Sequence, residues 1–315
     1  SGGQNPRPLS PSELQDFGHH LFEVLLPDDV RRLYDVARSR ESGSLFIVFT
    51  SMIPWVADLP WEFARDPNRG TNLATQDTHF VRNVLTPTPV EKLAPTEQLR
   101  MLVVSSEPNS HAQLSKTEEI AKLRHELRLL EGQSVITVDE LHRATAQELH
   151  SHIATGEFDV LHFIGHGFWN KPTGASGLVM EDGRGGAAHL EGQSLREVLA
   201  NRGLRLVFLN ACDTGRGRAD ASDAARSFGG VAQDLFAPGV PNVIANQLPV
   251  WDRAAVAFAR AFYSFLAQGK TIAEAVREAR IAVSLAPQSE PMDWAVPVAY
   301  ARDPEDRFIA RAPSS

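Results

Sequence analysis

The sequence has 315 residues, of which 43% are hydrophobic and 22% charged, as in an ordinary globular protein with one large or two smaller α/β domains. A net charge of −8 without a large basic block argues against direct nucleic-acid binding, and no apolar run reaches the roughly 20 residues that span a membrane. The single cysteine excludes an internal disulfide and a four-cysteine zinc site, and none of the eleven histidines forms a His-Glu-x-x-His motif. We therefore expect a cytoplasmic protein that binds no metal or other cofactor.

The N-terminal part of the chain is expected to form an α/β accessory region. The predicted elements are helices over 12–23 and 28–38 and a strand over 45–50. Ser10 or Ser12 is a suitable cap for the first helix. Repeated prolines in 86–95 interrupt both helix and sheet. We therefore predict an accessory region over 1–97 that packs on a core over 98–315.

In the core, apolar strands alternate with amphipathic helices. The predicted strands are 99–105, 135–138, 160–164, 204–209 and 240–245. The predicted helices are 117–130, 145–155, 193–200, 223–236, 253–267 and 272–284. Nearly continuous apolar strands are typical of strands buried on both faces, which indicates a mostly parallel sheet sandwiched by helices. The active site of such a sheet lies at the carboxyl ends of its strands.

Two side chains with hydrolytic chemistry follow the ends of two predicted strands. His166 follows the strand over 160–164, and Cys212 follows the strand over 204–209. Peptide hydrolysis by cysteine requires a thiolate, a proton carrier for the leaving amine and donors for the oxyanion. Cys212 and His166 are candidates for the first two roles, and the N–H groups of Gly167 and Cys212 for the third.

Each of these residues also has a structural interpretation. A lone cysteine is more often a small buried hydrophobe than a nucleophile, and a lone histidine at a strand end is similarly weak evidence. His162 is assigned a hydrogen-bonded structural role. The combination of Gly-His166-Gly after one strand with Asn-Ala-Cys212-Asp after another favours catalysis.

The two blocks resemble a known family. His-Phe-Ile-Gly-His166-Gly and Leu-Asn-Ala-Cys212-Asp-Thr are similar to the catalytic blocks of the CHAT domain, a bacterial branch of the caspase-like, clan CD cysteine peptidases. Further similar segments are 58–62, 228–230, 239–247 and 250–252, so the resemblance covers about residues 45–300. It implies a caspase-like fold, a His–Cys dyad, no metal and an oxyanion hole of backbone amides.

The resemblance also implies where the residue before the cleaved bond is recognised. Relatives that cleave after arginine or lysine have carboxylates beside the cysteine, and the corresponding positions here are Glu118, Glu119 and Asp252. Trp251 replaces an acidic residue of many relatives and is a candidate for the wall of the substrate groove. Alternatively, the two glutamates occupy the first turn of a helix because the helix dipole stabilises acidic side chains there, and Asp252 is the N-cap of the helix over 253–267.

A polar segment over 214–222 follows the cysteine and contains Arg216 and Arg218. In caspase-like enzymes this loop helps to form the substrate groove and is in some cases cut during activation, so either arginine is a candidate self-cleavage site. The alternative is a simple solvated loop.

These inferences predict a regulated, site-specific cysteine endopeptidase that cleaves a protein partner after a basic residue, with arginine favoured. The resemblance places such an enzyme in bacterial signalling or antiphage defence, with a fused or associated sensor or repeat domain as regulator. The start, Ser-Gly-Gly-Gln, resembles an expression scar and suggests an excised module. The alternatives are a catalytically silent caspase-like interaction scaffold and a cysteine hydrolase of non-peptide esters or amides.

Overall fold

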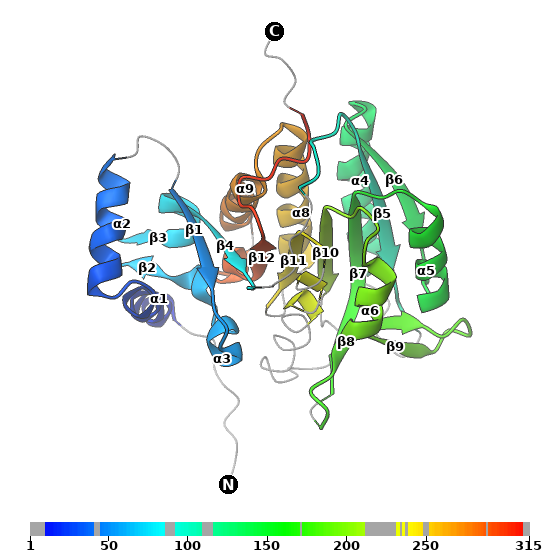
Figure 1. Cartoon of the computed structure of the whole chain (residues 1–315), viewed down its shortest axis with the longest axis horizontal. Helices are drawn as coiled ribbons and strands as arrows, with labels where there is room; N and C mark the ends of the chain where they lie inside the picture. The colour runs from blue at the N-terminus through cyan, green and yellow to red at the C-terminus, as the bar shows by residue number, and fades with distance from the viewer. Residues whose placement is uncertain are drawn as a thin grey trace.

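The computed structural model describes residues 10–40, 45–85, 92–108, 116–170, 172–211, 231–233, 235–236, 239–247, 252–287 and 289–310. A ten-stranded sheet runs through the described part of the chain (Figure 1). Its strands are β1 (Leu45–Thr50), β4 (Thr78–Asn83), β5 (Leu99–Ser105), β6 (Ile136–Leu141), β7 (Val160–Trp169), β8 (Ser176–Glu181), β9 (Ala187–Glu191), β10 (Leu206–Ala211), β11 (Asn242–Asn246) and β12 (Pro297–Ala301).

The sheet is mostly parallel, as the sequence predicts. The strand order is β1-β4-β12-β11-β10-β7-β5-β6, and β8 and β9 extend the end of β7 as antiparallel strands. Neighbours from β11 to β6 are all parallel, whereas β12 is antiparallel to β11. The carboxyl ends of β5, β7, β10 and β11 therefore lie along one edge of the sheet.

Helices cover both faces of this sheet (Figure 1). The helices are α1 (Pro11–Leu25), α2 (Asp28–Arg40), α3 (Pro54–Ala57), α4 (Lys116–Gly132), α5 (Ala146–Thr155), α6 (Gly192–Leu199), α8 (Asp252–Ala267) and α9 (Ile272–Leu285). One face packs against α4, α8 and α9 in a core that includes Val160 and Ile164 of β7. The other face packs against α5 and α6 in a second core that includes Leu161 and Phe163. The expected sandwich is therefore confirmed.

Side-chain caps explain where several helices begin. Ser10, rather than Ser12, caps α1, and its side chain and backbone exchange hydrogen bonds with Glu13 in a capping box. Thr145 caps α5 in the same way, and Thr271 caps α9. These boxes satisfy backbone N–H groups that have no partner within the helix.

Four strands of the main sheet have no counterpart in the sequence-based prediction. β4 has the sequence Thr-His-Phe-Val-Arg-Asn, whose polar residues hide the apolar pattern of a strand, and β12 begins with a proline. β8 and β9 flank the glycine-rich stretch, which is a hairpin connection. Oδ1 of Asp182 accepts hydrogen bonds from the backbone N–H groups of Arg184 and Gly186, at 2.7 and 2.8 Å, and these bonds hold the connection together.

The N-terminal region shares the main sheet with the rest of the chain. β1 and β4 pair in parallel, and β4 reaches β12 through the pair Arg82 and Tyr300. Beside them lie a two-stranded hairpin, β2 (Arg65–Asp66) and β3 (Thr71–Asn72), and the helices α1 and α2 (Figure 1). The division of the chain at residue 97 stays a prediction.

Candidate active site

His166 lies where β7 leaves the main sheet. Up to Gly165 the strand pairs with β10, whereas from His166 onward it pairs with β8, and His166 lies opposite Val179. The sequence predicts the end of this strand at Ile164. The strand is longer because β8 supplies new backbone partners beyond the sheet edge. His166 is buried, with only 7% of its surface exposed.

The glycine before His166 is required by close packing. A Cβ atom on Gly165 would lie 2.4 Å from the ring of Phe163 and 3.3 Å from the carbonyl oxygen of Ser106. The N–H of Ser106 donates to the carbonyl oxygen of Ile164 at 3.0 Å, which joins the ends of β5 and β7. A side chain at residue 165 would therefore displace the backbone that carries His166.

β10 ends at the same edge of the sheet as the part of β7 that pairs with it. Ala211, the last residue of β10, lies opposite Gly165 of β7. The residues that directly precede His166 and Cys212 in the sequence are thus paired across two neighbouring strands. Cys212 itself lies outside the described residues.

A pair of buried amides joins the ends of β10 and β11. Nδ2 of Asn246 donates to Oδ1 of Asn210 at 3.1 Å, and the two residues are 4% and 2% exposed. Sequence analysis did not identify this pair. Its signal is an asparagine at the end of each of two apolar strands, Leu209-Asn210 and Ala245-Asn246. The bridge fixes the strand end that leads to Cys212 relative to its neighbour.

His162 has the hydrogen-bonded structural role that the sequence analysis assigned to it. It lies four residues before His166 on the same face of β7, because alternate strand residues face the same side. Its Nδ1 lies 2.8 Å from the hydroxyl oxygen of Tyr263 in α8, and its ring stacks on Phe208 at 4.5 Å. Complete burial lowers the pKa of His162 to about 3, so the ring is neutral at physiological pH.

A comparison with models of known protein families assigns the chain to a family. The model of the CHAT domain matches residues 15–302, which is most of the sequence. The chain belongs to the CHAT domain family. The resemblance to the CHAT domain that the sequence blocks indicate is thereby confirmed. In a comparison with curated proteins, no sequence matches this CHAT domain.

Solved structures with a similar fold are distant in sequence. The Arg-specific cysteine proteinase gingipain R matches with a TM-score of 0.52 and 13% identity, over 96% of this chain and 69% of that one. The complex of the pro- and mature domains of the Porphyromonas gingivalis proteinase matches with a TM-score of 0.51 and 12% identity, over 95% and 70%. A separase–securin complex of Saccharomyces cerevisiae has a TM-score of 0.48 and 14% identity, over 82% of this chain and 15% of that one. These similarities concern the fold.

The expected specificity residues of this CHAT domain follow two strands of the active edge. Glu118 and Glu119 lie in the first turn of α4, which follows β5, and Asp252 is the first residue of α8, which follows β11. An ion pair between Arg260 and Glu126, at 3.2 Å, joins the two helices. The structure does not describe the side chains of these three acidic residues. Residues 216, 218 and 251 also lie outside the described part of the chain.

A buried charge cluster that sequence analysis did not identify joins the N-terminal region to α9. Glu62 pairs with Arg82 through both carboxylate oxygens, and its Oε1 lies 3.6 Å from Nη2 of Arg280. All three side chains are at most 1% exposed. Arg82 also donates to Oε1 of Gln247 at 3.2 Å. The cluster therefore connects the N-terminal region with the end of β11.

Within the described ranges, no group of three or more His, Cys, Asp or Glu side chains is arranged to hold a metal ion. No helix in the same ranges has both the length and the hydropathy needed to span a bilayer.

Proposed function

We propose that this CHAT domain is a regulated, site-specific cysteine endopeptidase in which Cys212 is the nucleophile and His166 the proton carrier. The observation that carries the proposal is the pairing of Gly165 with Ala211, because each catalytic candidate directly follows one of these residues. Neighbouring strands are about 4.8 Å apart, and consecutive Cα atoms are about 3.8 Å apart. These spacings favour an imidazole and a thiol within reach of each other.

The proposed reaction has two steps. The thiolate of Cys212 attacks the peptide carbonyl carbon, and the N–H groups of Gly167 and Cys212 stabilise the oxyanion. The C–N bond then breaks, and protonated His166 gives its proton to the leaving amine. Water then attacks the thioester carbonyl carbon and gives a proton to His166, and the C–S bond breaks, which restores the thiolate of Cys212 and protonated His166. Neutral, buried His162 takes no part in this proton transfer and instead packs β7 against α8.

We propose cleavage after a basic residue, with arginine favoured. Support comes from the positions of Glu118, Glu119 and Asp252 in first turns of helices that follow strands of the active edge. A carboxylate pair is suited to a guanidinium through two parallel hydrogen bonds. Trp251 is the proposed groove wall. Gingipain R, which shares the fold, is described as Arg-specific.

Regulation completes the proposal. A sensor or repeat domain, fused or associated, controls access to Cys212 in bacterial signalling or antiphage defence, and the substrate is a protein partner. Cleavage after Arg216 or Arg218 is the proposed self-processing step. The similar Porphyromonas gingivalis proteinase was solved as a complex of its pro- and mature domains.

The single cysteine permits a direct test. Iodoacetamide alkylates only Cys212, and His166 is expected to raise the thiolate fraction, so His166→Ala should slow alkylation at pH 6.5 at least tenfold. The control is His150→Ala, which removes an exposed histidine of α5 and should leave the rate unchanged. Mass spectrometry of a peptide-library digest then reports cleavage after arginine, which Cys212→Ala should abolish. Equal alkylation rates together with no digestion would contradict the proposal and favour the silent scaffold.

A further inference from the structure

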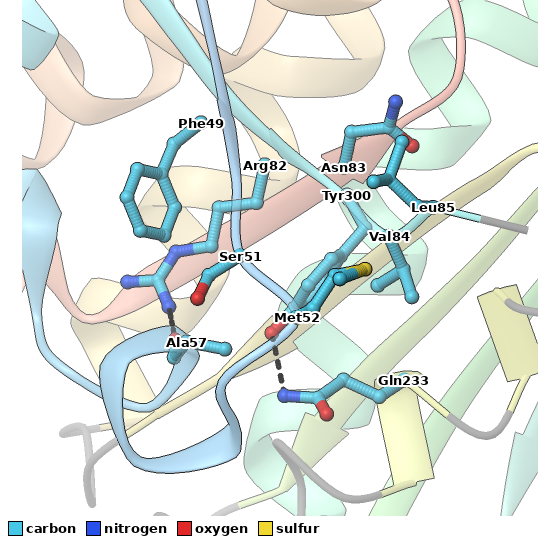
Figure 2. Close-up of a pocket in the computed structure, with 10 residues that line it drawn as sticks. All are labelled: Phe49, Ser51, Met52, Ala57, Arg82, Asn83, Val84, Leu85, Gln233 and Tyr300. Carbon is cyan, nitrogen blue, oxygen red and sulfur yellow. Dashed lines mark hydrogen bonds between the residues drawn. The ribbon is translucent and has the colours of Figure 1, made fainter.

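A cavity of about 330 Å³ opens at the ends of β1 and β4, away from the proposed dyad (Figure 2). Its lining residues are Phe49, Ser51, Met52, Ala57, Arg82, Asn83, Val84, Leu85, Gln233 and Tyr300. Three strands separate β4 from β7 in the sheet, which places the cavity roughly 20 Å from His166 at the usual strand spacing. It is therefore distinct from the pocket beside the cysteine.

The mouth of the cavity is apolar and open. Met52 and Leu85 are 81% and 63% exposed although both line the cavity. Ile53 and Trp55, in the same segment as Met52, are 51% and 69% exposed. Large apolar side chains gathered around a concave site are typical of a surface that binds another molecule.

The backbone beside the cavity lacks partners. The backbone ladder between β4 and β12 consists of the single pair Arg82 and Tyr300. Leu85 lies beyond Thr50 and Asn83, the last pair of β1 with β4, and within the described part of the chain its backbone makes no hydrogen bond, nor does the side-chain amide of Asn83. An extended peptide is the ligand that satisfies a row of free backbone groups at a strand end.

The one charged side chain in the lining is not available to a ligand. Arg82 donates to both carboxylate oxygens of Glu62, to the carbonyl oxygens of Ala57 and Leu59, and to Gln247. Figure 2 shows its guanidinium directed to Ala57. Each of its three nitrogens already has an acceptor and its charge is paired with Glu62, so the cavity offers no free cation to a phosphate or a carboxylate. This chemistry favours a neutral, apolar ligand.

We propose that this cavity binds an extended segment of a protein partner, with one large apolar side chain of that segment inserted between Phe49 and Tyr300. The partner backbone pairs with residues 83–85. The occupant also touches Gln233, whose Nε2 lies 3.4 Å from Oδ1 of Asp58 and 3.5 Å from the hydroxyl oxygen of Tyr300. Gln233 belongs to the chain that returns from Cys212, so a bound segment contacts both the N-terminal region and that returning chain.

The four methionines provide the readout. The full-length chain, in its Cys212→Ala form, is labelled with ¹³C-methyl methionine and titrated with acetyl-Thr-Val-Leu-Val-Thr-amide. Met52 is exposed at the mouth, whereas Met101 and Met180 are completely buried elsewhere. We expect a saturable shift of the Met52 signal alone. Binding in the Cys212→Ala form makes the result independent of whether the chain is a peptidase.

Two comparisons make the test decisive. Leu85→Asp places a carboxylate at the mouth and should weaken binding at least tenfold, whereas Leu285→Asp, at a 78% exposed site on α9, should change it less than twofold. A peptide with N-methylated valines, which cannot pair as a strand, should also bind at least tenfold more weakly. No saturable Met52 shift, or equal affinity in Leu85→Asp, would overturn the site. Equal affinity for acetyl-leucine amide, which has the apolar side chain but no strand to pair, would overturn the proposal that the ligand is an extended segment.

Discussion

His162 and His166 show how two identical side chains on one strand face acquire different properties. His162 is completely buried between Phe208 and Tyr263, and burial alone lowers its pKa to about 3. His166 lies four residues further on, where the strand leaves the sheet. The position along the strand therefore decides which imidazole is a neutral packing group and which one reaches the active edge.

The buried histidine predicts a pH dependence of stability. The folded-state pKa of His162 lies below the unfolded value, so the unfolded chain binds the extra proton. The contribution of neutral His162 to the unfolding free energy is fully present above about pH 6.5, and it is lost as the pH falls toward about 3. Between pH 6.5 and 4.5, wild type should lose about 2–3 kcal/mol more unfolding free energy than the double variant His162→Phe/Tyr263→Phe.

Urea unfolding at each pH measures this difference. The double replacement removes both hydrogen-bonding partners, so no polar group is left buried alone. His150→Gln, at an exposed position on α5, serves as the control and should retain the wild-type pH dependence. Parallel pH curves for wild type and the double variant would show that His162 is protonated in the folded protein.

At the scale of elements, a short segment before the core connects three parts of the molecule. Trp61–Phe63 forms a 3-10 helix whose Glu62 carboxylate meets Arg82 of β4 and Arg280 of α9. Arg280 also donates to the carbonyl oxygens of Phe80 and Pro297, both at 3.0 Å. One buried carboxylate thus compensates two buried guanidiniums and fixes α9 against the sheet.

Removal of that carboxylate should be strongly destabilising. Glu62→Gln keeps the shape of the side chain but leaves two cations buried without an anion, which should cost about 3–5 kcal/mol of unfolding free energy. Asp29→Asn breaks the exposed pair of Asp29 with Arg32 and should leave the urea midpoint nearly unchanged. Equal midpoints for wild type and Glu62→Gln would mean that water or other groups compensate the arginines.

At the scale of the whole molecule, the N-terminal region and the core share one sheet and one hydrophobic core. Trp61, Phe63 and Phe80 belong to the same buried cluster as Ile164 of β7 and Phe208 of β10. The two regions are thus joined by burial and charge compensation as well as by the pairing of β4 with β12. This supports an accessory region that packs on the core, the arrangement we propose for 1–97.

Truncation tests this dependence. A fragment of residues 98–315 would lose the packing of Phe63 on Trp294 and would leave Arg280 without both Glu62 and the carbonyl oxygen of Phe80, so we expect no cooperative urea transition for the fragment alone. Addition of a separate 1–97 fragment should restore a cooperative transition, followed by far-UV circular dichroism. Cooperative unfolding of 98–315 alone, with the midpoint of the full chain, would instead establish an independent core.

Local sequence determined the parallel strands β5, β6, β7, β10 and β11, the cap of α1 and the helices α4, α5, α6, α8 and α9, whereas the helix expected over 223–236 lies largely outside the described residues. Apolar periodicity and capping residues act within one element, so they are legible in a single sequence. The tertiary structure alone decided the places of β4 and β12, the extension of β7 and the partners of buried polar groups. Arg280 and Glu62 are far apart along the chain, as are Asn246 and Asn210. A local pattern shows which face of an element is buried, whereas the distant group that satisfies each buried charge or amide is chosen by packing.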